Sequence, residues 1–146
     1  AADISVHIDN VIKLSNLALL LYRWYVQNGH ARNIEDEKGV RSFFRQMLPP
    51  HPEKITDFYE RLYLYQSYCW YAFIMQDFLM YYRYTQKWVE LFHEEPLMVE
   101  IETASYIKGL HNLLSAHFDL QNFEKFDATL NEFEKFAETD QAQCAS

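Results

Sequence analysis

The sequence predicts an all-α protein, and three observations lead to this prediction. The 146 residues include only three glycines and four prolines, too few for the many tight turns of a sandwich or barrel. Every strong pattern of apolar residues has spacings of three and four, as a helix with one buried face requires. Signals for helix ends and helix starts also recur along the chain. A chain of this length can bury the core of one domain.

The first boundaries lie in the motifs NGHARNI and PPHPEKI. Gly29 is suited to the end of one helix, and Asn33 is suited to the N-cap of the next. Pro52 is suited to the first turn of a third helix, because its missing N–H would be unpaired there in any case. Pro96, in HEEPLMVEI, marks a later boundary of the same kind.

Two shorter breaks follow Gln76 and Gln121. Asp77 and Asn122 come next, and their side-chain oxygens can accept backbone N–H groups of the following turn. These boundaries predict six helices, over residues 4–28, 34–48, 53–75, 78–93, 97–120 and 123–138. The helices pair as three antiparallel hairpins, over residues 4–48, 53–93 and 97–138, and residues 139–146 form a polar tail.

The three hairpins match one another at a shift of 44–45 residues. A shift of 45 places Asp77 on Asn122 and Trp88 on Phe133. Residues 65–88, YQSYCWYAFIMQDFLMYYRYTQKW, then form the seam of the middle hairpin, with ten aromatic side chains in 24 residues. Trp88 and Phe133 are accordingly expected to be equivalent core residues.

The last hairpin, LHNLLSAHFDLQNFEKFDATLNEFEKF, resembles the tetratricopeptide repeat. It has the family's order of a large residue, a Leu, a short turn, an aromatic residue and a second helix. The positions that carry the resemblance are Leu110, Leu113, Phe123, Leu130 and Phe133. The chain departs from the family in its longer period, compared with about 34 residues, and in having Leu114 and Phe126 where the family has small residues. The resemblance implies three hairpins stacked as a right-handed superhelix.

In the family that the chain resembles, the first helix of each hairpin lines a concave groove that binds a peptide or helix. The resemblance therefore implies a partner-binding surface on the middle and last hairpins. Its residues are Tyr63, Gln66, Ser67, Trp70, Lys108, His111, Asn112 and Ser115. The alternative without a binding function is that these are ordinary surface residues, or that they pack against a further repeat.

The net charge of −8 is distributed unevenly. Residues 1–48 carry +1, residues 49–96 carry −3 and residues 97–146 carry −6, which add up to −8. Binding of nucleic acid requires clustered Lys and Arg, so no nucleic-acid partner is expected. A solvated acidic helix surface explains the charge of the C-terminal half.

A membrane span is not expected, because the longest uncharged stretch, residues 62–76, has 15 residues and a span needs about 20. Two cysteines, Cys69 and Cys144, do not make a disulfide framework. No signal peptide is recognisable. These features suit a cytoplasmic protein.

No motif for catalysis or for a cofactor stands out. Glu90 and His93 have the Glu-x-x-His spacing of di-iron bundles, but the chain has no second copy of that motif. Cys69 lies on an apolar stripe, where a thiol is inert. The sequence therefore predicts no metal, no cofactor and no catalytic residue.

The leading expectation is a noncatalytic scaffold that binds another protein or peptide, or a second copy of the chain, and that is complete or part of a longer array. The alternative is an all-α enzyme or small-molecule-binding protein that uses the surplus aromatic residues as a pocket. A closed pocket with converging polar groups would favour this alternative. An open groove with exposed aromatic residues would favour the scaffold.

Overall fold

A computed structural model of the chain describes the backbone of residues 2–145 and the side chains of residues 6–139. Within residues 2–145 the structure contains seven α-helices, one 3-10 turn and no strand, so the all-α prediction is confirmed. The elements are α1 (Ala2–Asn28), α2 (Ile34–Met47), η1 (Pro52–Lys54), α3 (Phe58–Met75), α4 (Phe78–Glu94), α5 (Leu97–Ile101), α6 (Thr103–Asp119) and α7 (Phe123–Ala145).

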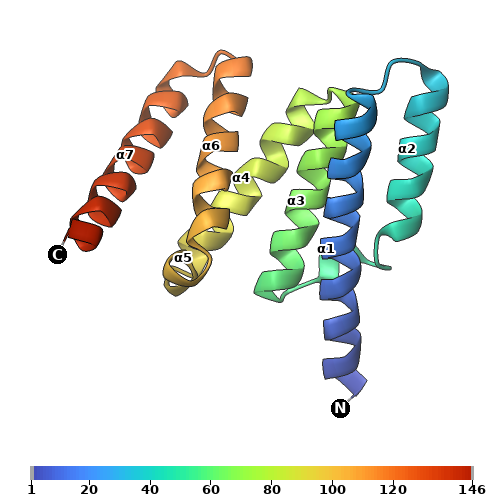
Figure 1. Cartoon of the computed structure of the whole chain (residues 1–146), viewed down its shortest axis with the longest axis horizontal. Helices are drawn as coiled ribbons and strands as arrows, with labels where there is room; N and C mark the ends of the chain where they lie inside the picture. Colours follow the sequence, from blue (N-terminus) through green and yellow to red (C-terminus); the bar gives the residue numbers. More distant parts are fainter. Residues whose placement is uncertain (1, 146) are drawn as a thin grey trace.

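Long helices that follow one another in the chain run antiparallel, whereas α1 and α3, which pack side by side, run parallel (Figure 1). Along the long axis of the molecule the long helices follow in the order α2, α1, α3, α4, α6 and α7, with the short α5 at the beginning of α6 (Figure 1). Helix α3 packs mainly on α1 and α4, and α6 packs mainly on α4 and α7. The first hairpin (α1 and α2) therefore packs on the middle hairpin (α3 and α4) through α1 and α3. The middle hairpin packs on the last one (α6 and α7) through α4 and α6. Antiparallel packing is shown, whereas a regular superhelix, which repeats one kind of junction, is not.

The predicted N-caps are confirmed. The side-chain oxygen of Asn33 accepts the backbone N–H of Asp36 at 2.8 Å, and Asp77 accepts that of Met80 at 3.1 Å. Each bond satisfies a backbone donor that has no partner inside its helix. Gly29 ends α1 with φ +74°, a left-handed conformation that glycine adopts without steric cost.

The turns of the last two hairpins are alike in detail. Gln76 and Gln121 both adopt a left-handed conformation, with φ of 57° and 58°. The next residue of each turn, Asp77 or Asn122, donates its N–H to a carbonyl five residues earlier, at 2.9 and 2.8 Å. This is the hydrogen bonding of a helix that ends in a left-handed residue. The 45-residue correspondence therefore holds at the turns.

The start of the third helix was predicted wrongly. Pro52 begins the 3-10 turn η1, and α3 starts only at Phe58. The N-cap is Asp57, whose carboxylate accepts the backbone N–H of Glu60 at 3.1 Å. Proline suits the first turn of either helix type, so the cap residue decides where the α-helix begins.

The single helix predicted over residues 97–120 is also wrong, because the chain breaks at Glu102 between α5 and α6. Glu102 has φ −115° and ψ 49°, outside the helical region. Its carboxylate accepts the hydroxyl of Tyr59 at 3.0 Å, and the Thr103 hydroxyl donates back to the Val99 carbonyl at 2.8 Å. The break contains neither Gly nor Pro and coincides with a contact to α3, so the local sequence gives no signal for it.

The last hairpin is less completely packed than the middle one. Trp88 is 2% exposed, whereas Phe133 on α7 is only partly buried. The two are therefore not equivalent core residues. Helix α7 contacts α6 on one side and has no long helix beyond it (Figure 1). It also extends to Ala145, through most of the stretch predicted as a polar tail.

Two hydrophobic cores meet at α3. One lies between α3, α4 and α6, and the other between α1, α2 and α3. The first contains Phe58, Leu62, Cys69, Trp88, Val89, Leu91, Phe92, Tyr106, Leu110 and Leu113, and the second contains Leu14, Leu17, Leu21, Val40, Phe44, Leu64 and Ile74. Helix α3 contributes to both and is apolar on opposite sides, as expected for a helix between two layers.

Trp88 fixes the contact between α4 and α6. Its indole N–H donates to the Ser105 carbonyl at 3.1 Å, and the ring lies against Gly109. A Cβ atom added at Gly109 would lie 2.9 Å from Trp88 Nε1 and 3.0 Å from Cδ1. Only glycine therefore fits at this position while the indole keeps its hydrogen bond.

Gly109→Ala should destabilise the protein, although alanine favours a helix by about 1 kcal/mol. Forcing a methyl group against the held indole costs about 1–3 kcal/mol. Gly39→Ala in α2 is the matched control, because a Cβ there meets nothing within 4 Å, and it should raise stability by about 0.5–1 kcal/mol. Urea unfolding of both variants measures the difference. Equal stabilisation by the two changes would show that Trp88 and Gly109 do not constrain each other.

His117 makes stability depend on pH. Its side chain is 3% exposed, and its Nδ1 atom has no hydrogen-bond partner among the described residues. Burial, and secondly the charge of Lys125, lower its pKa from the ordinary value of 6.5. The unfolded chain therefore binds a proton more readily than the folded one. The stability associated with neutral His117 is complete above about pH 6.5 and declines as the pH falls below it.

We expect His117→Gln to lose less thermal stability between pH 7 and pH 5 than the unsubstituted protein does. Glutamine has no proton to gain in this range, and the other titratable groups are the same in both proteins. Melting temperatures measured across the range give the comparison. Parallel curves for the two proteins would contradict a lowered His117 pKa.

Candidate functional site

A cleft of about 300 Å³ lies between α3, α4 and α6. Its residues are Gln66, Cys69, Trp70, Ala72 and Phe73 from α3, Phe78, Tyr81 and Trp88 from α4, and Lys108, Asn112, Ser115 and Asp119 from α6. We call this space the α3–α6 cleft. Helix α4 forms its floor because α4 packs on both of the helices that form the walls.

The two walls of the cleft differ in chemistry. The α3 wall presents mainly aromatic and small apolar side chains, including Trp70 and Phe73. On α6, Lys108, Asn112, Ser115 and Asp119 follow at spacings of four, three and four, which places them on one helical face. A bound group would meet an aromatic surface on one side and amide, hydroxyl and charged groups on the other.

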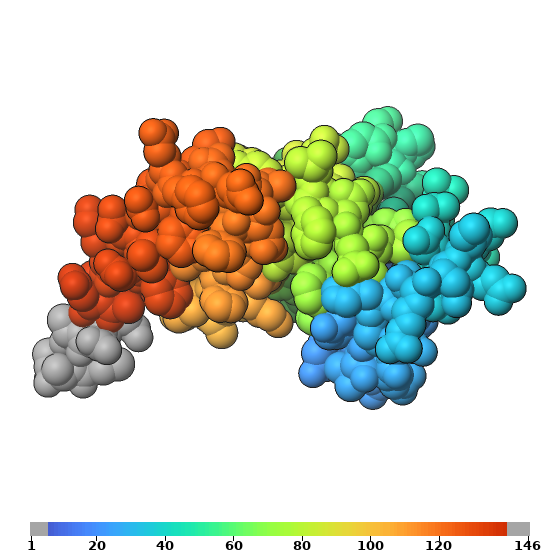
Figure 2. Space-filling view, turned by 90° about the horizontal axis from the view of Figure 1, so that it is seen from above, coloured from blue at the N-terminus to red at the C-terminus, as the bar shows by residue number. Residues whose placement is uncertain are grey.

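The cleft continues into a second hollow, which α1 closes on its far side. This outer groove, about 360 Å³ in volume, is lined by Ser15, Ala18, Leu19, Tyr22, Tyr63, Gln66, Trp70 and Lys108. Gln66, Trp70 and Lys108 line both spaces. Figure 2 shows the molecule hollowed between the blue atoms of α1 and the orange region that includes α6. The two spaces therefore adjoin each other, and we call them together the groove.

Six of the eight residues predicted for partner binding line this groove. Five line the α3–α6 cleft, namely Gln66, Trp70, Lys108, Asn112 and Ser115, and Tyr63 lines the outer groove. His111 is exposed on α6 and lines neither space.

Ser67 does not belong on this surface. It is fully buried, and its hydroxyl donates to the carbonyls of Tyr63 at 2.8 Å and Leu14 at 3.3 Å. The assignment of Ser67 to the groove was wrong because α1 packs on this part of α3, a contact that the hairpin pattern did not predict.

Trp70 is held in place by other aromatic rings. Its ring lies 5.2 Å from that of Tyr22 in an edge-to-face arrangement, and 5.8 and 6.0 Å from Tyr25 and Phe73. Such contacts favour a defined orientation of the indole. The part of Trp70 that faces the groove is therefore a rigid surface.

Two ionisable groups of the cleft, the thiol of Cys69 and the phenol of Tyr81, are protonated and neutral. Burial raises the pKa of the Cys69 thiol to about 12, although a contact between its sulfur and the Thr85 hydroxyl at 3.4 Å acts in the opposite direction. Burial also raises the pKa of Tyr81. A neutral thiol is a weak nucleophile. Cys69 is therefore a weak nucleophile in the folded protein.

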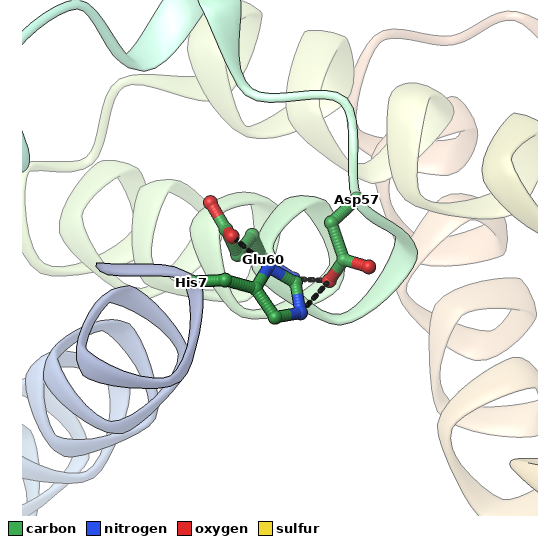
Figure 3. A group of neighbouring side chains, drawn as sticks. All are labelled: His7, Asp57 and Glu60. Carbon is green, nitrogen blue, oxygen red and sulfur yellow. Dashed lines mark hydrogen bonds and ion pairs between the residues drawn. The ribbon is translucent and has the colours of Figure 1, made fainter. Parts of the chain in front are cut away.

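A second cluster, which the sequence did not reveal, joins the beginnings of α1 and α3 (Figure 3). His7 hydrogen-bonds to Glu60 through Nδ1 and lies 3.5 Å from Asp57 Oδ2 through Nε2. Asn10 donates to the other Glu60 oxygen at 3.4 Å. Glu60 is only 7% exposed. The separation of about 50 residues between the partners hides this cluster from sequence patterns.

The side chains of His7, Asp57 and Glu60 could hold a divalent cation, because one ligand atom from each lies within 4.8 Å of the others. Each group also has a structural role. Asp57 caps α3, and Glu60 stands three residues later, as in a capping box. His7 and Asn10 supply partners for the buried carboxylate. These contacts therefore explain the cluster as a set of polar interactions that holds α1 against α3.

The Glu90–His93 pair leads to a different contact from the one that its spacing suggests. Nε2 of His93 lies 2.5 Å from Oε1 of Glu132 on α7, which also accepts the Tyr106 hydroxyl at 2.7 Å. His93 thus connects α4 to the last helix.

Comparison of the chain with protein-family models, with curated proteins and with solved structures finds no match. The comparisons therefore identify no family, and the structure alone defines the fold as all-α, with seven helices within residues 2–145. In the part of the chain that the structure describes, none of the helices is long and apolar enough to cross a membrane.

Cys69 should react slowly with thiol reagents while the protein is folded. Its raised pKa leaves little thiolate at pH 8, and the side chain is 3% exposed. A Cys144→Ser variant leaves Cys69 as the only thiol. Labelling with iodoacetamide, followed by mass spectrometry, should show modification only after denaturant is added. Rapid labelling of the folded variant would contradict the assignment of Cys69 to a buried, neutral state.

Proposed function

We propose that the protein is a noncatalytic module that binds a segment of another protein in the groove formed by the α3–α6 cleft and the outer groove. The single observation that carries this proposal is that the two spaces adjoin at Gln66, Trp70 and Lys108. A compact ligand would fill only the cleft. A peptide in helical or extended form fits an elongated groove that has anchor sites along its length.

The composition of the groove supports a protein partner. Trp and Tyr are among the residue types that dominate binding energy at protein interfaces, and the groove contains Trp70 and Tyr63 with the positive charge of Lys108 beside them. Lys108 forms no ion pair with a described residue. It is therefore free to bind an acidic group or the carboxyl end of a peptide.

The tetratricopeptide resemblance points to the same surface. It implies that the first helices of successive hairpins line a concave groove, and α3 and α6 are those helices. We propose a divergent superhelix of this type, with the longer period leaving α4 exposed as a floor between α3 and α6. The different junctions between hairpins would be part of that divergence.

Binding of a small apolar molecule is the second candidate function. The volume of the cleft, about 300 Å³, lies at the lower end of the range for ligand pockets. The amide of Asn112 and the hydroxyl of Ser115 would orient such a ligand against the aromatic wall. A fragment screen by NMR would distinguish it, because small-molecule binding would shift resonances of cleft residues and leave those of Ser15 and Leu19 in the outer groove unchanged.

Selection of peptides from a displayed library on the immobilised protein tests the main proposal. Enriched peptides should bind in the groove, so Asn112→Trp, which places a large ring in the cleft, should weaken them by roughly tenfold or more. His111→Trp is the matched control, because it makes a similar change one residue away and outside both spaces. It should leave affinity unchanged, as measured by fluorescence anisotropy.

Two results would contradict the proposal. One is the absence of any enriched peptide, and the other is equal affinity for the two tryptophan variants. Circular dichroism of both variants provides the folding control, because the helix content should stay that of the unsubstituted protein.

A further inference from the structure

Helix α1 presents apolar side chains on two of its faces. One face is buried against α3 through Leu14, Leu17 and Leu21, each at most 1% exposed. A second face is exposed, and its apolar residues lie outside both cores. These residues are Ile8, Ile12, Leu19, Tyr22 and Val26, between 46% and 63% exposed. A helix that is apolar on two faces is normally covered on both.

The exposed residues have the spacing of a coiled-coil seam. Together with Ser15 they follow one another at intervals of four, three, four, three and four residues, over three heptads. A seam with a period of 3.5 residues packs against another helix at a small crossing angle. The surface is therefore shaped for one straight helix lying alongside α1, and we call it the α1 stripe.

The charges beside the α1 stripe identify the helix that fits it. Asp9, Asn16 and Arg23 are seven residues apart, so they form one flank of the stripe. All three are exposed in the structure, and neither Asp9 nor Arg23 forms an ion pair with a described residue. Along α1 the flank is acidic, then neutral, then basic. A second copy of α1 that runs in the opposite direction therefore presents a basic residue opposite the acidic one and an acidic residue opposite the basic one.

We propose that α1 pairs with α1 of a second copy of the chain in antiparallel orientation, about a two-fold axis near the middle of the stripe. In antiparallel pairs, equivalent flanks face each other, so Asp9 of each copy would meet Arg23 of the other. Asn16 would then meet Asn16 at the axis. An interface that uses the same patch on both copies is the common arrangement of soluble homodimers.

Self-association through α1 goes beyond the proposed peptide-binding function. The dimer and a peptide that extends into the outer groove would compete, because Ser15, Leu19 and Tyr22 belong to both surfaces. The α3–α6 cleft contains no residue of α1 and stays open. Each dimer would thus carry two clefts. Because Ile8, Asp9, Ile12 and Arg23 line neither space, their variants test the dimer independently of the groove.

Sedimentation equilibrium over a series of concentrations is the first test. We expect a reversible dimer with a dissociation constant on the order of 1–100 μM. Ile12→Glu should weaken it by roughly tenfold or more, because the charge would be buried in the seam. Ile101→Glu on α5, an apolar residue that is 66% exposed, is the matched control and should leave the dimer unchanged.

Charge reversal then tests the antiparallel orientation. Asp9→Arg alone and Arg23→Asp alone should each weaken self-association, because like charges would face each other at both ends of the seam. An equimolar mixture of the two variants should form dimers as well as the unsubstituted protein does, since each meeting then joins an Arg and an Asp. In a parallel pair the two positions lie about two heptads apart along the axis, and mixing would restore nothing.

Three results would overturn the proposal. The first is a monomer at every concentration up to several hundred micromolar, which lies above the expected range of dissociation constants. The second is equal weakening of the dimer by Ile12→Glu and Ile101→Glu. The third is failure of the mixed charge variants to recover dimerisation. Both charged positions are on the surface of α1, so unchanged circular dichroism spectra should accompany each variant. If a single charge variant unfolds, the Ile12→Glu comparison still decides whether the α1 stripe forms the interface.

Discussion

The structure depends on the position of α3, which is buried on both sides. Leu62 and Cys69 face the core that α3 shares with α4 and α6, and Leu64 and Ile74 face the core that it shares with α1 and α2. Burial of apolar surface is the main favourable term in folding. A single helix that contributes to both cores joins them into one folding unit, and the other helices take their places relative to it. The fastening of His7 to Glu60 secures one end of this arrangement.

The groove follows from the way in which the helices beyond α3 are packed. Helix α6 lies on α4 and not on α3, so the surface of α4 between them remains uncovered. The close contact between Trp88 and Gly109 sets the position of α6, and the aromatic contacts of Trp70 set the shape of the opposite wall. A surface that is rigid before binding loses little conformational entropy when a partner is bound. The walls of the cleft are therefore held in place without a bound partner.

The proposed peptide groove and the proposed dimer seam overlap on α1. Leu19 and Tyr22 belong to the α1 stripe and also line the outer groove, whereas the α3–α6 cleft is separate from α1. Association through α1 would place two clefts in one assembly, and linked binding sites bind a divalent partner more tightly than single sites do. The acidic side chains of α7 lie at the opposite end of the molecule from α1 (Figure 1), so they do not oppose pairing there at physiological salt.

The sequence by itself determined the helical class, most helix boundaries and the kind of residues that line the groove. Local signals suffice for these features, because caps such as Asn33 and Asp77 and spacings of three and four act within one helix. The tertiary structure alone decided three others: the break at Glu102, the burial of Ser67 and the partial exposure of Phe133. Each depends on which helix lies opposite, and the periodicity of one helix specifies that it has a buried face without specifying the neighbour that covers it.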